Sequence, residues 1–115
     1  MANKTPHILF EDFLKVEMRI GTVIDAKINT KAHKPAYVLS IDFGPSGIKT
    51  SSAQITAHYT PEDLIGQQVV AVLNFASKLI AGVRSEVLVL GAMSDKDRVI
   101  LLRPTLPVPN GSSIG

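Results

Sequence analysis

Basic side chains are the residues of this chain whose type and spacing most readily suggest chemistry. Lys27, Lys31, His33 and Lys34 lie close together, and no acidic residue falls between positions 26 and 41. Lysines neutralise phosphate groups and release their counterions, so this cluster could hold an anionic polymer such as RNA. The alternative is a solvated loop whose lysines only keep the protein soluble.

A second basic pair, Lys78 and Arg84, lies in another stretch without acidic residues, between positions 63 and 86. The whole chain is only mildly basic, with a formal net charge of +2 and a pI of about 9.0. Any binding of anions must therefore come from local patches rather than from overall charge.

Residues that could support catalysis do not form a recognisable site. The three histidines, His7, His33 and His58, are far apart and match no metal-ligand spacing. Ser51 and Ser52 with His58 could be imagined as nucleophile and base, but no Gly-x-Ser-x-Gly elbow is present. There is also no glycine-rich phosphate loop. We therefore expect no catalytic residue, no metal site, no cofactor and no enzymatic activity.

The basic clusters must be positioned by strands, and the segment 14–28 is the clearest of them. Its apolar side chains fall on even positions and most of its charges on odd ones, which is the period of a strand with one buried and one wet face. Gly21 in its middle would let the strand bend or bulge. A long, bent first strand that serves both halves of a small barrel is typical of an oligonucleotide/oligosaccharide-binding (OB) fold.

The other segments complete an all-β class: a five-stranded OB-fold barrel in a single domain over residues 1–115. A short helix is expected at 8–14. A second is expected between strands 3 and 4, where Thr60 is the N-cap, Pro61 and Asp63 follow it, Leu64 and Ile65 point inward, and Gly66 ends the helix. The remaining predicted strands are 37–43, 48–53, 69–75, 86–93 and 99–102, with turns at 44–47 and 94–97. The tail 104–115 is expected to dock through its apolar residues Leu106, Val108 and Ile114.

Aromatic and aliphatic side chains divide into core and contact residues. Tyr37, Phe43 and Phe75 share parity with aliphatic neighbours, which predicts burial. Phe10 and Phe13 lie on a helix that a barrel does not need for closure, so they are candidates for a dimer or peptide contact. The apolar run that contains Val87 and Leu88 has no polar face, and we expect both of its faces to be covered, directly or across a two-fold axis, which predicts a homodimer.

Nothing in the sequence indicates that this chain is itself secreted or inserted into a membrane. No apolar stretch approaches the ~20 residues of a membrane helix, and residues 1–7 lack the pattern of a signal peptide. Cysteine is absent, which permits a reducing compartment. We therefore expect a cytoplasmic protein.

Several motifs taken together resemble the CsaA family of export-related chaperones, within the wider group of tRNA-binding OB domains. They are DFLKVEMRIGTV at 12–23, HKPAY at 33–37, SSAQIT at 51–56, QVVAVLNF at 68–75, SEVLVLG at 85–91 and PVPNG at 107–111. The resemblance implies an OB fold, a homodimer, tRNA binding and binding of unfolded or preprotein chains. The tRNA-contacting surface of the group matches Arg19, Asn74, Lys78 and Ser85 here.

The predicted function is tRNA binding by a CsaA-type OB protein. Structured RNA would be bound through Arg19, Lys27, Lys31, Lys34 and Lys78, with Asn74 and Ser85 adding hydrogen bonds. The protein could also act as a passive, ATP-independent chaperone in protein export. The alternative is a chaperone that primarily holds polypeptide and binds RNA incidentally.

Overall fold

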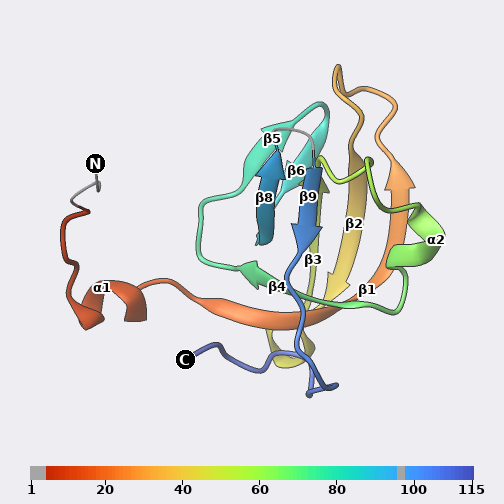
Figure 1. The fold of residues 1–115 in the computed structure, drawn as a ribbon. Coiled ribbons are helices and arrows are strands. Elements are labelled where there is room, and N and C mark those ends of the chain that lie inside the picture. The colour runs from red at the N-terminus through yellow and green to blue at the C-terminus, as the bar shows by residue number, and fades with distance from the viewer. Residues whose placement is uncertain (1–4, 96–97) are drawn as a thin grey trace.

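A five-stranded antiparallel sheet is the main element of the computed structural model, which describes residues 5–95 and 98–115. Its strands, in spatial order, are β3 (Ile48–Ala53), β2 (Tyr37–Asp42), β1 (Met18–Ile28), β4 (Gln68–Val72) and β7 (Leu88–Val89). The sheet curls until its two ends meet, where the Glu86 N–H donates to the Thr50 carbonyl at 2.8 Å. The result is a nearly closed barrel, and the predicted OB-like fold is confirmed (Figure 1).

Smaller elements surround the barrel. The hairpins are β5 (Lys78–Ile80) with β6 (Val83–Ser85), and β8 (Gly91–Asp95) with β9 (Arg98–Leu101). The helices are α1 (Phe10–Leu14), α2 (Pro61–Leu64) and the single 3₁₀ turn η1 (Gly44–Ser46). Figure 1 shows α1 standing away from the barrel, and the C-terminal tail running along the underside of β1.

Gly21 lies in the middle of β1 because the core leaves no room for a side chain there. A Cβ atom on Gly21 would lie 2.6 Å from Ile41 Cγ2 and 2.6 Å from Phe43 Cδ1. The irregularity in β1 lies further on, where the pairing with β2 shifts between Val23 and Asp25. We expected Gly21 to let this strand bend, but the structure shows that a glycine is needed there because the core packs closely against it.

The predicted alternation along β1 is wrong beyond Gly21. Val23 is fully buried in the core, whereas Ile24 is 45% and Ile28 is 66% exposed. The odd positions Gly21 and Val23 already face the core, and the shift in pairing between Val23 and Asp25 then restores the even positions, so Ala26 lies in the core. The strand also begins at Met18 rather than at 14, because α1 continues to Leu14.

The helix α2 begins as predicted. The Asp63 N–H donates to Thr60 Oγ1 and the Thr60 N–H donates to Asp63 Oδ2, both at 3.2 Å, which forms a reciprocal capping box. Leu64 is fully buried, but Ile65 is 49% exposed, so the expectation that both point inward holds only for Leu64. Gly66 follows with φ +90°.

The C-terminal tail docks on β1 as expected, but through its backbone. The Ile20 N–H donates to the Ser112 carbonyl at 2.9 Å, and the Gly111 N–H donates to the Ile20 carbonyl at 2.7 Å. Asn110 Oδ1 accepts from Thr22 Oγ1 at 2.6 Å. Leu106 remains 73% exposed, so apolar burial of that side chain does not hold the tail.

The strands after α2 depart most from prediction. The segment 69–75 leaves the sheet after Val72, so Phe75 is 58% exposed rather than part of the core, whereas Tyr37 and Phe43 are buried as predicted. The single strand predicted at 86–93 is two strands, β7 and β8. The hairpin β5–β6 was not predicted at all. In the turn predicted at 94–97, Ser94 and Asp95 belong to β8, and 96–97 lie outside the described residues.

Candidate nucleic-acid interface

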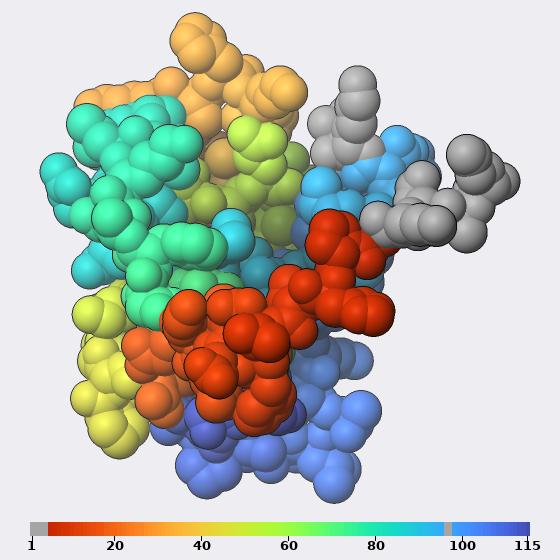
Figure 2. Space-filling model, turned by 90° about the vertical axis from the view of Figure 1, so that its left-hand side faces the viewer, coloured from red at the N-terminus to blue at the C-terminus, as the bar shows by residue number. Residues whose placement is uncertain are grey.

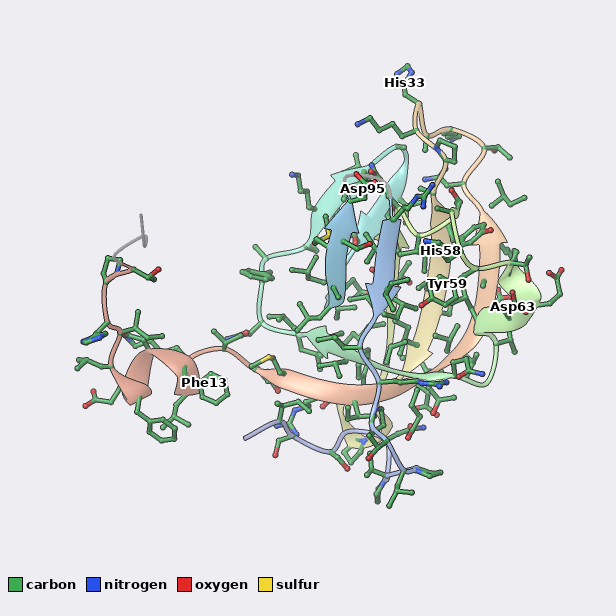
Figure 3. All side chains as sticks on the ribbon, viewed as in Figure 1. Phe13, His33, His58, Tyr59, Asp63 and Asp95 are labelled. Carbon is green, nitrogen blue, oxygen red and sulfur yellow. The ribbon has the colours of Figure 1, made fainter. Side chains whose placement is uncertain are left out.

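The loop between β1 and β2, residues 29–36, carries most of the first basic cluster. Its ends are held together because the Asn29 N–H donates to the Ala36 carbonyl at 2.9 Å, and both residues are buried. Asn29 Oδ1 accepts from the Lys31 N–H at 3.1 Å, which fixes the first turn of the loop. Figure 3 shows His33 at the tip, pointing away from the barrel. A pinned base therefore presents a basic tip to solvent.

The β5–β6 hairpin lies beside this loop. Its two-residue turn places Ala81 at φ +47° and Gly82 at φ +81°, as a type I′ turn requires. The Lys31 stem crosses the turn so closely that a Cβ on Gly82 would lie 3.0 Å from Lys31 Cδ. Figures 1 and 2 both show the loop and the hairpin as neighbours at one end of the barrel. We call this region, residues 29–36 and 78–85, the loop end.

The hairpin is also tied to the barrel wall. Lys78 pairs directly with Ser85 across the two strands. Ser85 Oγ accepts from the Ser52 N–H of β3 at 3.0 Å. Ser85, one of the predicted RNA contacts, thus has a structural partner in β3, and it holds Lys78 in place on the opposite strand.

Three of the predicted RNA-contacting cations lie at the loop end without an acidic partner. Among the described residues, Lys31, Lys34 and Lys78 form no ion pair and are all exposed. Lys27 lies at the end of β1 next to the loop, and its Nζ is 3.6 Å from Asp25 Oδ2. The three unpaired ammonium groups can therefore engage phosphate oxygens without first losing an internal contact.

Arg19 and Asn74 lie elsewhere, where α1, β1 and the tail meet. The Arg19 guanidinium donates to Glu17 Oε2 and to the Gly111 carbonyl, both at 2.8 Å. Asn74 donates to the Lys15 carbonyl at 2.6 Å and accepts from the Glu17 N–H at 2.9 Å. These bonds fix the chain between α1 and β1, so the two predicted contact residues are occupied internally and separate from the loop end.

The predicted dimer or peptide contacts are partly exposed. Phe10 is 72% exposed, and its ring centroid lies 6.1 Å from that of Phe13. Leu88 is 50% exposed, but Val87 is only 5% exposed and belongs to the hydrophobic core, so it offers no surface contact. Three aliphatic residues extend the exposed surface around α1: Ile8, Leu9 and Leu14. We call residues 8–14 the apolar arm (Figure 2).

Metal-binding, nucleophilic and membrane-spanning features were also considered in the sequence, and the structure shows how each stands. In residues 5–95 and 98–115, no cluster of three His, Cys, Asp or Glu side chains could hold a metal ion. Ser51, which sequence reasoning considered as a nucleophile, is 1% exposed. Over the same described ranges, no helix has both the length and the apolar character needed to cross a membrane.

Sequence reasoning missed several residues that line the loop end. A hollow of about 350 Å³ opens between the loop and the hairpin. Besides the basic side chains, its lining includes Ser52, Gln54, Ile80 and Ala81. Gln54 stands in the motif SSAQIT but was used only for the resemblance. The Ala81-Gly82 pair between two short apolar runs was the signal that could have predicted the hairpin.

Comparisons with known proteins agree with the fold. Residues 18–113 match the family described as "Putative tRNA binding domain". The crystal structure of a CsaA chaperone from Bacillus anthracis is similar with 54% identity and a TM-score of 0.92, covering 96% of this chain and 100% of that one. A CsaA chaperone from Picrophilus torridus has 44% identity and a TM-score of 0.87, over 95% and 100% of the two chains.

Curated relatives include much longer proteins. A methionine–tRNA ligase of Flavobacterium johnsoniae is 33% identical over 93% of this chain, and one of Pyrococcus abyssi is 34% identical over 96%. The chain spans only 15% of the length of each of these ligases.

Proposed function

The chain belongs to the tRNA-binding domain family, with the CsaA type as its structural relatives, and from that premise we propose that it binds tRNA through its loop end. The observation that carries the proposal is the set of three exposed cations without acidic partners that two neighbouring segments present: Lys31 and Lys34 on the loop and Lys78 on the hairpin. Such groups bind phosphates by releasing counterions.

Within this proposal the predicted contact residues take different roles. Lys31, Lys34 and Lys78 bind phosphates directly, and Lys27 adds a weaker charge at the edge of the surface because it shares Asp25. Ser85 holds the hairpin to β3. Arg19 and Asn74 keep the α1–β1 connection in shape rather than binding RNA, since each side chain already makes two hydrogen bonds within the chain.

The salt dependence of tRNA binding tests this proposal. With about 3–5 phosphate contacts, the logarithm of the association constant should fall against log salt with a slope of roughly −2 to −4. Lys34→Glu and Lys78→Glu should each weaken binding by a similar factor for every tRNA, because phosphate contacts carry no sequence information. Lys15→Glu, directly after α1 and outside the loop end, is the control for a charge reversal elsewhere, although Lys15 also pairs with Asp12. A salt-independent affinity, or one unchanged by both reversals, would rule the loop end out.

We propose that the chain acts as a binding module without catalysis, in the cytoplasm, and as one domain over residues 1–115. The ligase relatives are enzymes by name, but this chain matches only 15% of their length. The CsaA chaperones, in contrast, are covered over their whole solved chains.

The apolar arm supports a homodimer. Ile8, Leu9 and Phe10 are each 66% exposed or more, and such a continuous apolar surface is typical of an interface. Light scattering should give twice the 12.4 kDa mass of one chain at micromolar concentration. Phe10→Ser with Phe13→Ser should shift the protein toward monomer, whereas Phe75→Ser, at an exposed aromatic residue outside the arm, should not. A wild-type protein with the mass of one chain would contradict the dimer.

A second candidate function is the holding of unfolded or preprotein polypeptide, which the names of the CsaA relatives favour. The sequence has no glycine-rich phosphate loop, so we expect the protein to hold clients without releasing them by nucleotide hydrolysis. It should suppress aggregation of a denatured test protein in proportion to its own concentration, with no response to ATP. Lack of protection at several-fold excess would leave tRNA binding as the sole function.

A further inference from the structure

The hollow between the loop and the hairpin has the size of a site for a small chemical group rather than for a duplex. Its volume is about 350 Å³, near the lower end of the ~300–1,000 Å³ range of ligand pockets. Ala32, Ala36, Ile80 and Ala81 give it apolar walls. A paired base in a helix could not enter it, whereas a single unpaired base could.

Two polar side chains at the hollow carry hydrogen-bonding groups that no other described residue uses. Ser52 donates its backbone N–H to Ser85, but its hydroxyl has no partner among those residues. Gln54 is exposed and its amide likewise makes no bond within residues 5–95 and 98–115. A glutamine amide presents a donor beside an acceptor, which matches the N6 and N7 edge of adenine in two bonds.

Cations and a ring surround the same hollow. Lys31 and Lys34 line the hollow, where they can bind the phosphates on either side of a base. His33 at the loop tip offers an exposed ring on which a neighbouring base outside the hollow can stack. Lys34 and Gln54 also line a second hollow of about 410 Å³ with Pro35, Thr56 and Ala57. The two hollows share a wall, so a single strand could continue from one into the other.

We propose that the loop end binds an unpaired segment of RNA, with one base, preferentially adenine, in the hollow against Gln54. This inference rests on the proposed function, because it names which part of a structured RNA the loop end takes. Phosphate contacts by Lys31 and Lys34 then supply affinity, and the amide of Gln54 supplies the choice of base.

Three RNA hairpins of identical stem test the proposal: one blunt, one with a 3′ overhang of four adenosines and one with four uridines. Wild-type protein should bind the adenosine overhang about tenfold more tightly than the uridine overhang, as a two-bond contact to a base allows. Gln54→Ala should reduce that ratio to about one and leave the salt slope unchanged. Gln67→Ala, at an exposed glutamine that lines neither hollow, is the matched control.

A second variant tests the hollow independently, in case the Gln54→Ala substitution acts indirectly. Ala32→Phe should fill the hollow and abolish the gain from either overhang, while circular dichroism shows that the protein remains folded. If tRNA and all three hairpins bind equally, the unpaired-base site is wrong and the phosphate-binding surface stands. If neither tRNA nor any hairpin binds, the proposed function itself fails.

Discussion

The loop end and the opposite end of the barrel, where the tail docks, use polar side chains in opposite ways. At the tail end, Arg19, Asn74 and Asn110 all bond to other segments of the chain. At the loop end, Lys34 and Lys78 have no partner among the described residues. These three polar side chains therefore hold the chain together at the tail end. At the loop end Asn29 and Ser85 also bond within the chain, but the two lysines remain available to a ligand.

The two ends also differ in packing: the docked tail is closely packed, whereas the loop end is hollowed. At the tail end the backbones approach closely, and a Cβ on Gly44 would lie 2.5 Å from the Asn110 carbonyl oxygen. At the loop end two hollows of about 350 and 410 Å³ remain. A hollow of about 650 Å³ also lies beside tail residues 104–107, so the close packing is confined to the docked segment 110–112. We infer that substitutions at the tail end act on stability, and substitutions at the loop end act on binding.

Gly111→Ala should have the largest effect of the predicted substitutions, and it should act on stability. Gly111 has φ +91°, and its Cβ would lie 2.5 Å from the Phe43 carbonyl oxygen. Strain and overpacking together should lower the free energy of unfolding by about 2–5 kcal/mol. Gly47→Ala, at φ +90° and ψ −176° but in open space, should cost only about 1–3 kcal/mol, from backbone strain without overpacking. Urea titration of both variants measures the difference, and equal losses would show that the tail is not tightly docked.

Lys31→Ala with Lys34→Ala should weaken tRNA binding about 10–100-fold at low salt and leave stability within about 0.5 kcal/mol of wild type. Loss of two phosphate contacts should also make the salt slope shallower by about 1.4–1.8. Fluorescence anisotropy across a salt series and a thermal melt measure the two quantities. A stability loss without a change of slope would contradict the division between the two ends.

Asn74→Ala should show the reverse pattern with a smaller effect. It removes the bonds to the Lys15 carbonyl and the Glu17 N–H, so the free energy of unfolding should fall by about 0.5–2 kcal/mol. The salt slope of tRNA binding should remain that of wild type. An intact stability with a weakened tRNA affinity would instead return Asn74 to the contact surface that the family resemblance implies.

Lys27→Ala should have the smallest effect. Its ammonium group is largely solvent-exposed and already 3.6 Å from Asp25 Oδ2, so its net attraction for a phosphate is partly cancelled. We expect tRNA affinity to fall about twofold or less, in the same anisotropy assay. A loss as large as that of the Lys31 and Lys34 double variant would extend the binding surface along β1.

Features of the fold that depend on residues close together in the chain could be predicted from the sequence. The Thr60–Asp63 capping box and the β2–β3 pairing depend on neighbours in the chain, and both were predicted. The role of Gly21 was predicted wrongly because a glycine is required there by the close approach of Ile41 and Phe43, which are distant in sequence. The shift after Val23 likewise depends on the pairing with β2 and is invisible in the alternation of β1.

The candidate site was predictable in composition but not in arrangement. Lys31, Lys34 and Lys78 were identified from charge and resemblance, yet only the fold brings the 29–36 loop against the β5–β6 hairpin. Arg19 was expected on a wet face, but the docked tail supplies the Gly111 carbonyl that it binds. Internal partners of this kind come from segments as much as 92 positions away, which local sequence patterns do not encode.

Amide chemical shifts of the ¹⁵N-labelled protein, recorded while an unlabelled tRNA is added, test most directly whether RNA binds at the loop end. The account predicts that the largest shifts and broadening fall on residues 29–36, 52–54 and 78–85. The signals of residues 108–114, and those of the two separate residues Arg19 and Asn74, should change little. Shifts concentrated on the tail and the α1–β1 connection, with the loop and the hairpin unaffected, would contradict it.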